Sequence, residues 1–348
     1  MRRNESRETT ILAAVIEQYT RTGEPVPSAD IARETSLGLS PASIRSVMVK
    51  LAEQGYLEQP HISSGRVPTP KAFRLYVDTV LAPEPLGAAE KAAINSALDP
   101  GDVEIPYILR RASALVSNRC LQLGVVLAPR RDELRWRGIE FSLVAPRLVL
   151  AVLILDGGLV RTRMVTVPQE YTAEELAYCS NYLNSHFRGY ALSEARVRME
   201  RELEQAGEQL EAMCRRALAL SRPALEANEE DREVFMDGIR EVSHTATFSG
   251  AARLRELLSF LEERQRLLEL LERTMESRDI SVSFLQGDHG TTPWAVVSAP
   301  YAPHGEGAPL GVVGAVGLLH MDYATVLPVV AHIAGSLASV LERRLDPA

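Results

Sequence analysis

The clearest hydrophobic pattern in the chain begins just after residue 40. Its apolar residues recur at the i, i+3, i+4, i+7 spacing of one buried helix face: Ile44, Val47, Met48 and Leu51. Ser40 is a favourable N-cap, and Pro41 suits the first helical position because its missing N–H has no partner to lose there. The pattern predicts a helix that begins at Pro41 and ends at Gly55.

The opposite face of this helix carries side chains that are short or basic. Its side chains can approach a groove closely: Ala42, Ser43, Arg45, Ser46, Val49 and Lys50. No carboxylate interrupts this face before Glu53. Residues 56–57 then begin a short strand, residues 60–65 form a polar turn, and residues 66–68 return. We therefore predict a two-stranded wing with Arg66 near its tip.

Two shorter helical patterns precede this helix. Residues 10–20 are apolar in helical phase, and Ser28 caps a second short helix over residues 29–35. The order helix, helix, turn, helix, wing is that of a winged helix-turn-helix, a DNA-binding motif. A further helix over residues 70–81 and a proline-rich break at 83–87 end this first domain near residue 82.

Strand and helix patterns alternate in blocks beyond this break. Four apolar runs with turns between them predict an antiparallel meander: residues 121–128, 135–144, 148–155 and 159–167. Residues 172–229 are helical and charged, and residues 233–242 have the pattern of a lone strand. Leucines from residue 254 step by three and four in an amphipathic helix. Packing within one subunit is the favoured interpretation of that helix, and a subunit interface is the alternative.

Strand patterns return over residues 280–319, and a helix over 326–345 closes the chain. One sheet domain interrupted by an insertion accounts for this order more simply than two small sheets. The predicted fold class is therefore α+β and multidomain. The predicted domains are 1–82 (winged helix-turn-helix), 83–102 (linker), 103–170 with 277–348 (interrupted sheet domain) and 171–276 (mainly helical insertion).

Charge is distributed unevenly along the chain. The net charge is −8, yet residues 1–80 contain ten Lys/Arg and nine Asp/Glu, a net +1, whereas the remainder contains 28 and 37, a net −9. An acidic remainder joined to a locally basic N-terminal segment suits DNA binding by one face of the protein. The attraction to DNA of any sequence is then modest.

Catalytic and metal-binding patterns are lacking. The three cysteines, Cys120, Cys179 and Cys214, are too far apart in the sequence for a disulfide framework or a zinc site, and no histidine pair has metal spacing. Glycines recur every third residue at 311, 314 and 317, which matches no nucleotide loop and favours close strand packing. No serine lies in a nucleophile elbow. We predict no enzyme, no cofactor and no metal.

Targeting signals are lacking too. The first residues have no apolar stretch, and no uninterrupted apolar run approaches the roughly 20 residues of a membrane span. We expect a cytoplasmic protein without a membrane partner.

The exposed helix face and the wing supply the expected contacts to double-stranded DNA. Ser43, Arg45 and Ser46 would face base edges or adjacent phosphates in the major groove, and Lys50 a phosphate. The wing would reach the backbone or the minor groove. The predicted DNA-binding residues are Ser40, Ala42, Ser43, Arg45, Ser46, Lys50, His61, Ser63, Ser64 and Arg66.

Several short segments together resemble the HrcA family of heat-inducible transcription repressors. They are EPVPS at 24–28, SPASIR at 40–45, GYLEQPH at 55–61, SSGRVPT at 63–69 and YVD at 76–78, with weaker likeness at Tyr301 and at Met321, Asp322 and Tyr323. The resemblance covers nearly the whole chain.

This resemblance implies a winged helix, a GAF-like domain and a dimerisation domain inserted into it. It also implies a homodimer that binds an inverted-repeat operator upstream of chaperone genes and depends on the GroE chaperonin, so that heat releases repression. For the dimer interface we predict Leu254, Leu257, Leu261, Leu268, Met321, Asp322 and Tyr323.

The chain departs from the family at two places. Ser43 and Ser46 stand where the family usually has Thr and Asn, and Ser46 lacks the amide that pairs bidentately with adenine, so we expect a different operator sequence. The family signature Gly-Pro-x-Arg-Met-Asp-Tyr appears at residues 317–323 without its proline and arginine. The resemblance implies that this arginine makes a contact between GAF-like domains in other family members. This chain lacks the arginine, so the same contact is not expected here.

The alternative function is a winged-helix regulator controlled by a small effector in its GAF-like domain. That function requires polar groups that converge on one pocket. The β-rich body offers few candidates: Trp136, Arg137, Asp156, Arg161 and Tyr301.

Overall fold

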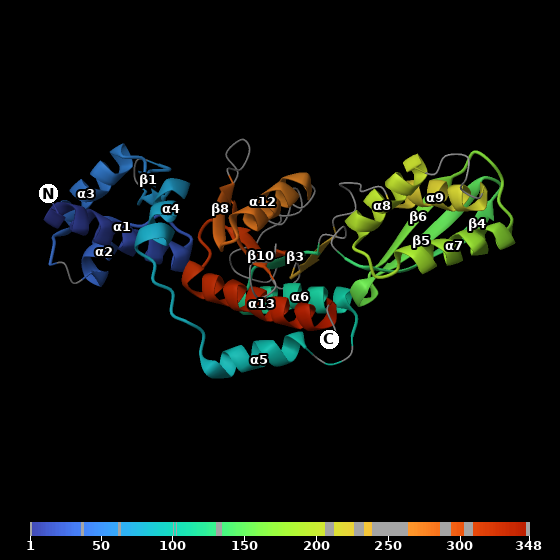
Figure 1. Cartoon of the computed structure of the whole chain (residues 1–348). Coiled ribbons are helices and arrows are strands. Elements are labelled where there is room, and N and C mark those ends of the chain that lie inside the picture. The colour runs from blue at the N-terminus through green and yellow to red at the C-terminus, as the bar shows by residue number, and fades with distance from the viewer. Residues whose placement is uncertain are drawn as a thin grey trace.

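The computed structural model describes residues 2–35, 38–61, 64–99, 101, 103–129, 134–205, 212–225, 233–238, 264–285, 294–302 and 309–345. These residues form three units in a row, with the N-terminal unit at one end (Figure 1). The N-terminal unit consists of α1 (Arg2–Thr22), α2 (Ser28–Glu34), α3 (Pro41–Glu53), β1 (Leu57–Glu58), β2 (Val67–Pro68) and α4 (Pro70–Thr79).

Helix α3 has the predicted bounds and orientation. The Ser40 hydroxyl accepts a hydrogen bond from the Ser43 N–H at 3.2 Å, which caps the helix. Ile44, Met48 and Leu51 are buried, and they pack in one core with residues of α1, α2 and α4. Helix α1 is longer than predicted: it begins at Arg2 and not near residue 10. Its first turns contain no apolar phase, but they also contain no glycine or proline that would end a helix.

The middle unit is built on a five-stranded antiparallel sheet with the order β7-β3-β10-β9-β8. Its strands are β3 (Leu123–Leu127), β7 (Val234–Asp237), β8 (Ser281–Leu285), β9 (Trp294–Tyr301) and β10 (Gly311–Leu318). Helices α6 (Ile105–Cys120) and α13 (Tyr323–Leu345) cover one face, and α12 (Arg264–Ser277) covers the other. Helix α5 (Ala88–Leu98) packs outside α6 and α13.

Alternate residues of these strands face the two helical layers. On β10, Val313 and Ala315 pack into the larger core, whereas Val312 and Val316 pack into a second core with Leu271 of α12. The glycines at 311, 314 and 317 permit close packing, because a Cβ there would meet atoms of Tyr301, Val297 and Gln122, respectively. This confirms the packing interpretation of these glycines.

The third unit contains a second antiparallel sheet with the order β4-β5-β6. Its elements are β4 (Trp136–Ala145), β5 (Leu148–Leu155), the short turn η2 (Asp156–Gly158), β6 (Val160–Thr166), α7 (Ala173–Phe187), α8 (Leu192–Gln205) and α9 (Ala212–Leu225). The buried side of β5 packs into the core beneath α7 and α9.

The predicted meander is wrong in one respect. The run that became β3 does not pair with β4; it pairs with β10 on one side and with β7, the expected lone strand, on the other. The five-stranded sheet is thus assembled from segments on both sides of residues 134–225, and that intervening part carries its own sheet. Local turn signals predicted the strands but not the partner of β3, which lies almost 190 residues further along the chain.

Helix α13 is long and apolar enough to cross a membrane by length and composition, although half of that apolar stretch is buried. No long uninterrupted apolar run marks this helix in the sequence, because histidine, serine and proline interrupt its apolar residues. Its buried residues, among them Val330, Ile333 and Leu337, belong to the core shared with the five-stranded sheet.

Candidate nucleic-acid interface

The exposed face of α3 consists of the residues expected there. Ala42, Ser43, Arg45, Ser46 and Lys50 are all exposed, and Val49 is 39% exposed beside them. The serine hydroxyls are engaged locally: Ser46 donates to the Ala42 carbonyl at 3.2 Å, and Ser40 lies 3.0 Å from Ser43. A hydroxyl held this way keeps lone pairs for an outside donor. This face of α3 is therefore exposed and carries mainly polar, short side chains.

The two cations of this face differ in their surroundings. Lys50 forms an ion pair with Glu8 of α1, with Nζ and Oε1 2.6 Å apart. Arg45 has no ion pair or hydrogen bond to any residue that the structure describes. Glu8 lies 42 residues upstream of Lys50, in the part of α1 that has no apolar pattern, so the sequence pattern did not predict this ion pair.

The ribbon of β1 and β2 lies beside this helix. His61 is exposed, and the turn is held by its carbonyl, which accepts from the Ser64 hydroxyl at 2.7 Å. Arg66 is half-buried and lies next to β2, not at the predicted tip, because its backbone pairs with Val26 through hydrogen bonds of 2.8 and 2.9 Å. Ser63 lies outside the described residues.

Two residues fix the ribbon to the helices. A Cβ on Gly65 would overlap the backbone of Pro25 and Val26, so glycine alone fits this crossing without a shift. The Thr69 hydroxyl donates to the Gly55 carbonyl at 2.8 Å and accepts from the Ala72 N–H at 3.3 Å, which joins the end of α3 to the start of α4. These contacts explain why the segment that resembles the family has glycine at 65 and threonine at 69.

Residues 321–323, which are predicted to lie at a dimer interface, join two parts of one chain. Tyr323 is buried, and its ring centroid lies 5.8 Å from that of Phe73 in α4. The ring of His320 lies 5.5 Å from that of Tyr19 in α1. Asp322 caps α13 by accepting from the Ala324 N–H at 3.1 Å, and it also accepts from the Thr325 hydroxyl at 2.7 Å. Burial within the chain leaves little of Met321 and Tyr323 for a partner subunit.

The leucine helix likewise contributes to a core. Leu268 of α12 packs against the second core, on the five-stranded sheet. This agrees with the favoured interpretation, packing within one subunit. Leu254, Leu257 and Leu261 lie outside the described residues.

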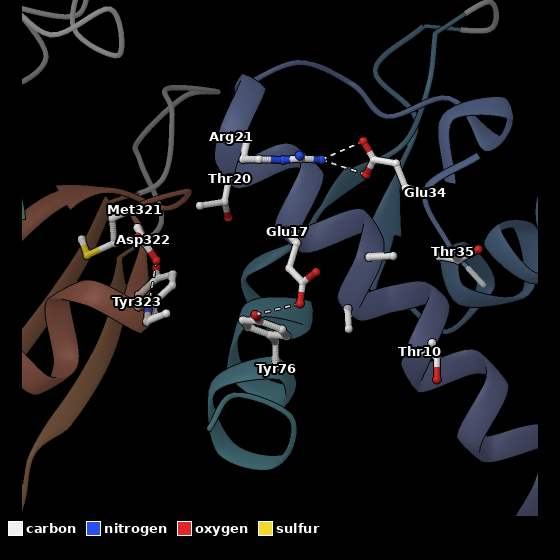
Figure 2. Close-up of a pocket in the computed structure, with 13 residues that line it drawn as sticks. Thr10, Glu17, Thr20, Arg21, Glu34, Thr35, Tyr76, Met321, Asp322 and Tyr323 are labelled. Carbon is white, nitrogen blue, oxygen red and sulfur yellow. Dashed lines mark hydrogen bonds and ion pairs between the residues drawn. The ribbon is translucent and has the colours of Figure 1, made fainter. Parts of the chain in front are cut away.

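A groove of about 980 Å³ lies where the N-terminal unit meets Asp322 (Figure 2). Glu17 and Tyr76 point toward each other in it, with the Tyr76 hydroxyl donating at 3.4 Å. Burial and the nearby carboxylates of Glu17 and Asp322 raise the pKa of Tyr76 to about 12. Arg21 is neutralised by Glu34 at 2.8 Å. The resulting negative potential disfavours phosphate, so DNA is not expected in this groove.

The polar residues named for an effector pocket do not all meet at one place, because four lie in the third unit, where Arg161 is buried, and Tyr301 lies in the middle unit. Trp136 is buried and donates to Asn184 at 3.1 Å, and Asp156 is paired with Arg137, all in the third unit. Tyr301 is buried in the middle unit, where it donates to the Leu127 carbonyl at 2.7 Å. Within the described part of the chain, no group of three or more His, Cys, Asp or Glu could hold a metal ion.

A helix with an exposed face of short side chains, beside a two-stranded ribbon and attached to a separate body, is typical of transcription regulators. Residues 107–327 match the model of the HrcA protein C-terminal domain. The heat-inducible transcription repressor HrcA of Nitratidesulfovibrio vulgaris strain Miyazaki F is 50% identical over 347 residues, which cover 98% of this chain and 97% of that protein. The chain therefore belongs to the HrcA family of heat-inducible transcription repressors.

Two further comparisons agree. The repressor HrcA of Geobacter sulfurreducens is 34% identical, covering 97% of this chain and 98% of that protein. A crystal structure described as that of a hypothetical protein at 2.2 Å resolution has the same fold, with a TM-score of 0.55 at 20% identity over 96% of this chain and 97% of that one. Because these HrcA relatives are repressors and not enzymes, the prediction that the chain is not an enzyme is confirmed.

Proposed function

We propose that this chain represses transcription by binding double-stranded DNA, with α3 in the major groove and the ribbon of β1 and β2 as the wing of a winged helix-turn-helix. The observation that carries the proposal is the exposed face of α3. It presents Arg45 without an internal partner in the described residues, between the short side chains of Ala42 and Ser46. A helix with such a face can approach base edges closely.

Each polar or charged residue predicted to bind DNA then has a role. Arg45 pairs with a base edge, most favourably guanine, and Ser43 and Ser46 hydrogen bond to bases or phosphates. Lys50 contacts a phosphate, which requires it to leave Glu8. Ser40 caps the helix and contributes mainly through its backbone. His61, Ser64 and Arg66 contact DNA from the wing, and Ser63, which lies outside the described residues, remains a predicted contact.

We further propose a homodimer formed through the open face of the three-stranded sheet. No described helix covers that face, and its centre is apolar: Leu148, Leu150, Val152, Ile154, Val160 and Met164. The polar side chains of Glu140, Ser142, Thr162 and Thr166 lie beside them on the same face. Cross-strand pairs place Leu150 beside Met164 and Ile154 beside Val160. An exposed apolar patch of this kind indicates a protein partner, and a second copy of the chain presents an identical patch.

The domain assignment follows from these roles. We propose residues 1–82 for DNA binding and the five-stranded sheet with α6, α12 and α13 as the GAF-like domain. The inserted dimerisation domain then comprises β4 to β6 with α7 to α9. The strand pairing favours a start for this insertion between β3 and β4, earlier than residue 171.

The target genes and the partner are carried over from the family. We propose an inverted-repeat operator upstream of chaperone genes, dependence on the GroE chaperonin, and action in the cytoplasm, where the DNA lies. A dimer with two-fold symmetry reads two half-sites of opposite orientation, which supports the inverted repeat.

Footprinting tests the proposal. The purified protein is applied to the DNA upstream of its own gene and of the chaperonin genes, at two salt concentrations, with and without chaperonin. We expect a protected inverted repeat at both salt concentrations and stronger protection with chaperonin. The repressor assignment fails if no inverted repeat is protected.

A further inference from the structure

Most basic side chains of the N-terminal unit are already engaged within the chain. Three form ion pairs, Arg21 with Glu34, Arg33 with Asp30 and Lys50 with Glu8. Two lie over aromatic rings, Lys71 over Tyr56 and Arg74 over Phe284. Among the described side chains of this unit, Arg7, Arg45 and Arg66 have no such partner. The unit therefore presents less positive charge to DNA than its composition suggests.

The pair of Lys50 and Glu8 differs from the others by its place. It is the only one of these pairs that engages a cation on the exposed face of α3. Its Nζ and Oε1 atoms are 2.6 Å apart, and the side chain of Glu8 is 16% exposed against 51% for Lys50. The Glu8 side chain is thus largely buried, whereas about half of the Lys50 side chain is open to solvent.

We infer that Glu8 is a specificity-determining residue, which holds Lys50 so that this lysine adds little to the affinity for DNA of arbitrary sequence. The inference rests on the proposed function, because it takes the exposed face of α3 to be the DNA-contacting face. Glu8 itself acts through Lys50 and contacts no base.

The physical argument is a competition for one ammonium group. A phosphate that binds Lys50 must displace the Glu8 carboxylate, so the pair reduces the gain from that contact. On an operator, Arg45 and the serines bond to base edges and hold α3 at full depth, where a phosphate can replace Glu8. On random DNA these contacts are missing, and Lys50 remains with Glu8. The pair therefore weakens binding to random DNA more than binding to the operator.

The substitution Glu8→Gln tests the inference, because it keeps the shape of the side chain and removes its charge. We expect affinity for a random duplex to rise about threefold or more at low salt, and the slope of log K against log salt to steepen by about one phosphate contact. Affinity for the operator should rise less, so the specificity ratio falls. Glu34→Gln is the matched control, since it removes the same charge and breaks the Arg21 ion pair at the other end of α1.

The double variant Glu8→Gln/Lys50→Gln separates the mechanism from general charge repulsion. Compared with Lys50→Gln alone, it should show no rise in affinity for the random duplex. An equal rise in the Lys50→Gln background, or an equal rise in Glu34→Gln, overturns the inference. So does an unchanged affinity for the random duplex in Glu8→Gln, provided that the wild type prefers its operator. If the wild type shows no such preference, the proposed function itself fails and the inference fails with it.

Discussion

At the scale of single residues, Arg45 carries the proposed base recognition. It is exposed on α3 and has no bonding partner among the described residues, so its guanidinium is available for two parallel hydrogen bonds to one base. Arg45→Ala should cost about 1–3 kcal/mol on the operator and leave binding to a random duplex nearly unchanged. Competition binding at one fixed salt concentration measures both.

Arg188→Ala provides a charge-matched control for this experiment, because Arg188 is exposed at the end of α7 in the third unit. A full specificity ratio in Arg45→Ala would show that α3 is oriented differently on the DNA.

At the scale of elements, the sequence predicts local structure better than long-range partners. The bounds of α3 follow from its own apolar phase and cap, and both lie within one segment. The pairing of β3 with β10 depends on residues almost 190 positions apart, which no turn signal records. For the same reason Arg45 and the serines of the candidate site were found, whereas Glu8 was missed.

Gly65 sets how closely the ribbon of β1 and β2 approaches Pro25 and Val26. Gly65→Ala places a methyl group against the backbone of Pro25 and Val26, so the ribbon must move away from these two residues. Overpacking of this kind costs about 1–3 kcal/mol. Amide hydrogen exchange of Val26 and Arg66, whose N–H groups bond to each other's carbonyls, should accelerate about tenfold or more.

Gly87→Ala is the control for this substitution, because a Cβ at Gly87 has no atom within 4 Å and its φ of −62° suits alanine. Slow exchange retained at Val26 in Gly65→Ala would show that the ribbon tolerates the methyl group without moving.

At the scale of the whole molecule, helix α3, proposed to bind DNA, and the three-stranded sheet, proposed to form the dimer, lie at opposite ends of the row of three units (Figure 1). The N-terminal unit contacts the middle unit through Tyr19, Phe73 and Arg74, and the open sheet face belongs to the third unit. A dimer formed through the third units would connect the two N-terminal units through the middle and third units of each chain. The contact of Tyr323 with Phe73 then matters for function, because it fixes the orientation of each N-terminal unit relative to its middle unit.

Met164→Glu tests this arrangement. Met164 is 48% exposed on β6, so the substitution should leave the fold intact, but it places a charge in the proposed apolar interface. We expect a monomer in sedimentation analysis and operator affinity lower by about 10²-fold or more, because two half-sites are no longer bound together. Val197→Glu, at a site on α8 that is 46% exposed, should remain a dimer with unchanged operator affinity. Dissociation by Val197→Glu with a stable dimer in Met164→Glu would move the interface from the sheet to the helices, and the two N-terminal units would then need a different spacing on their operator.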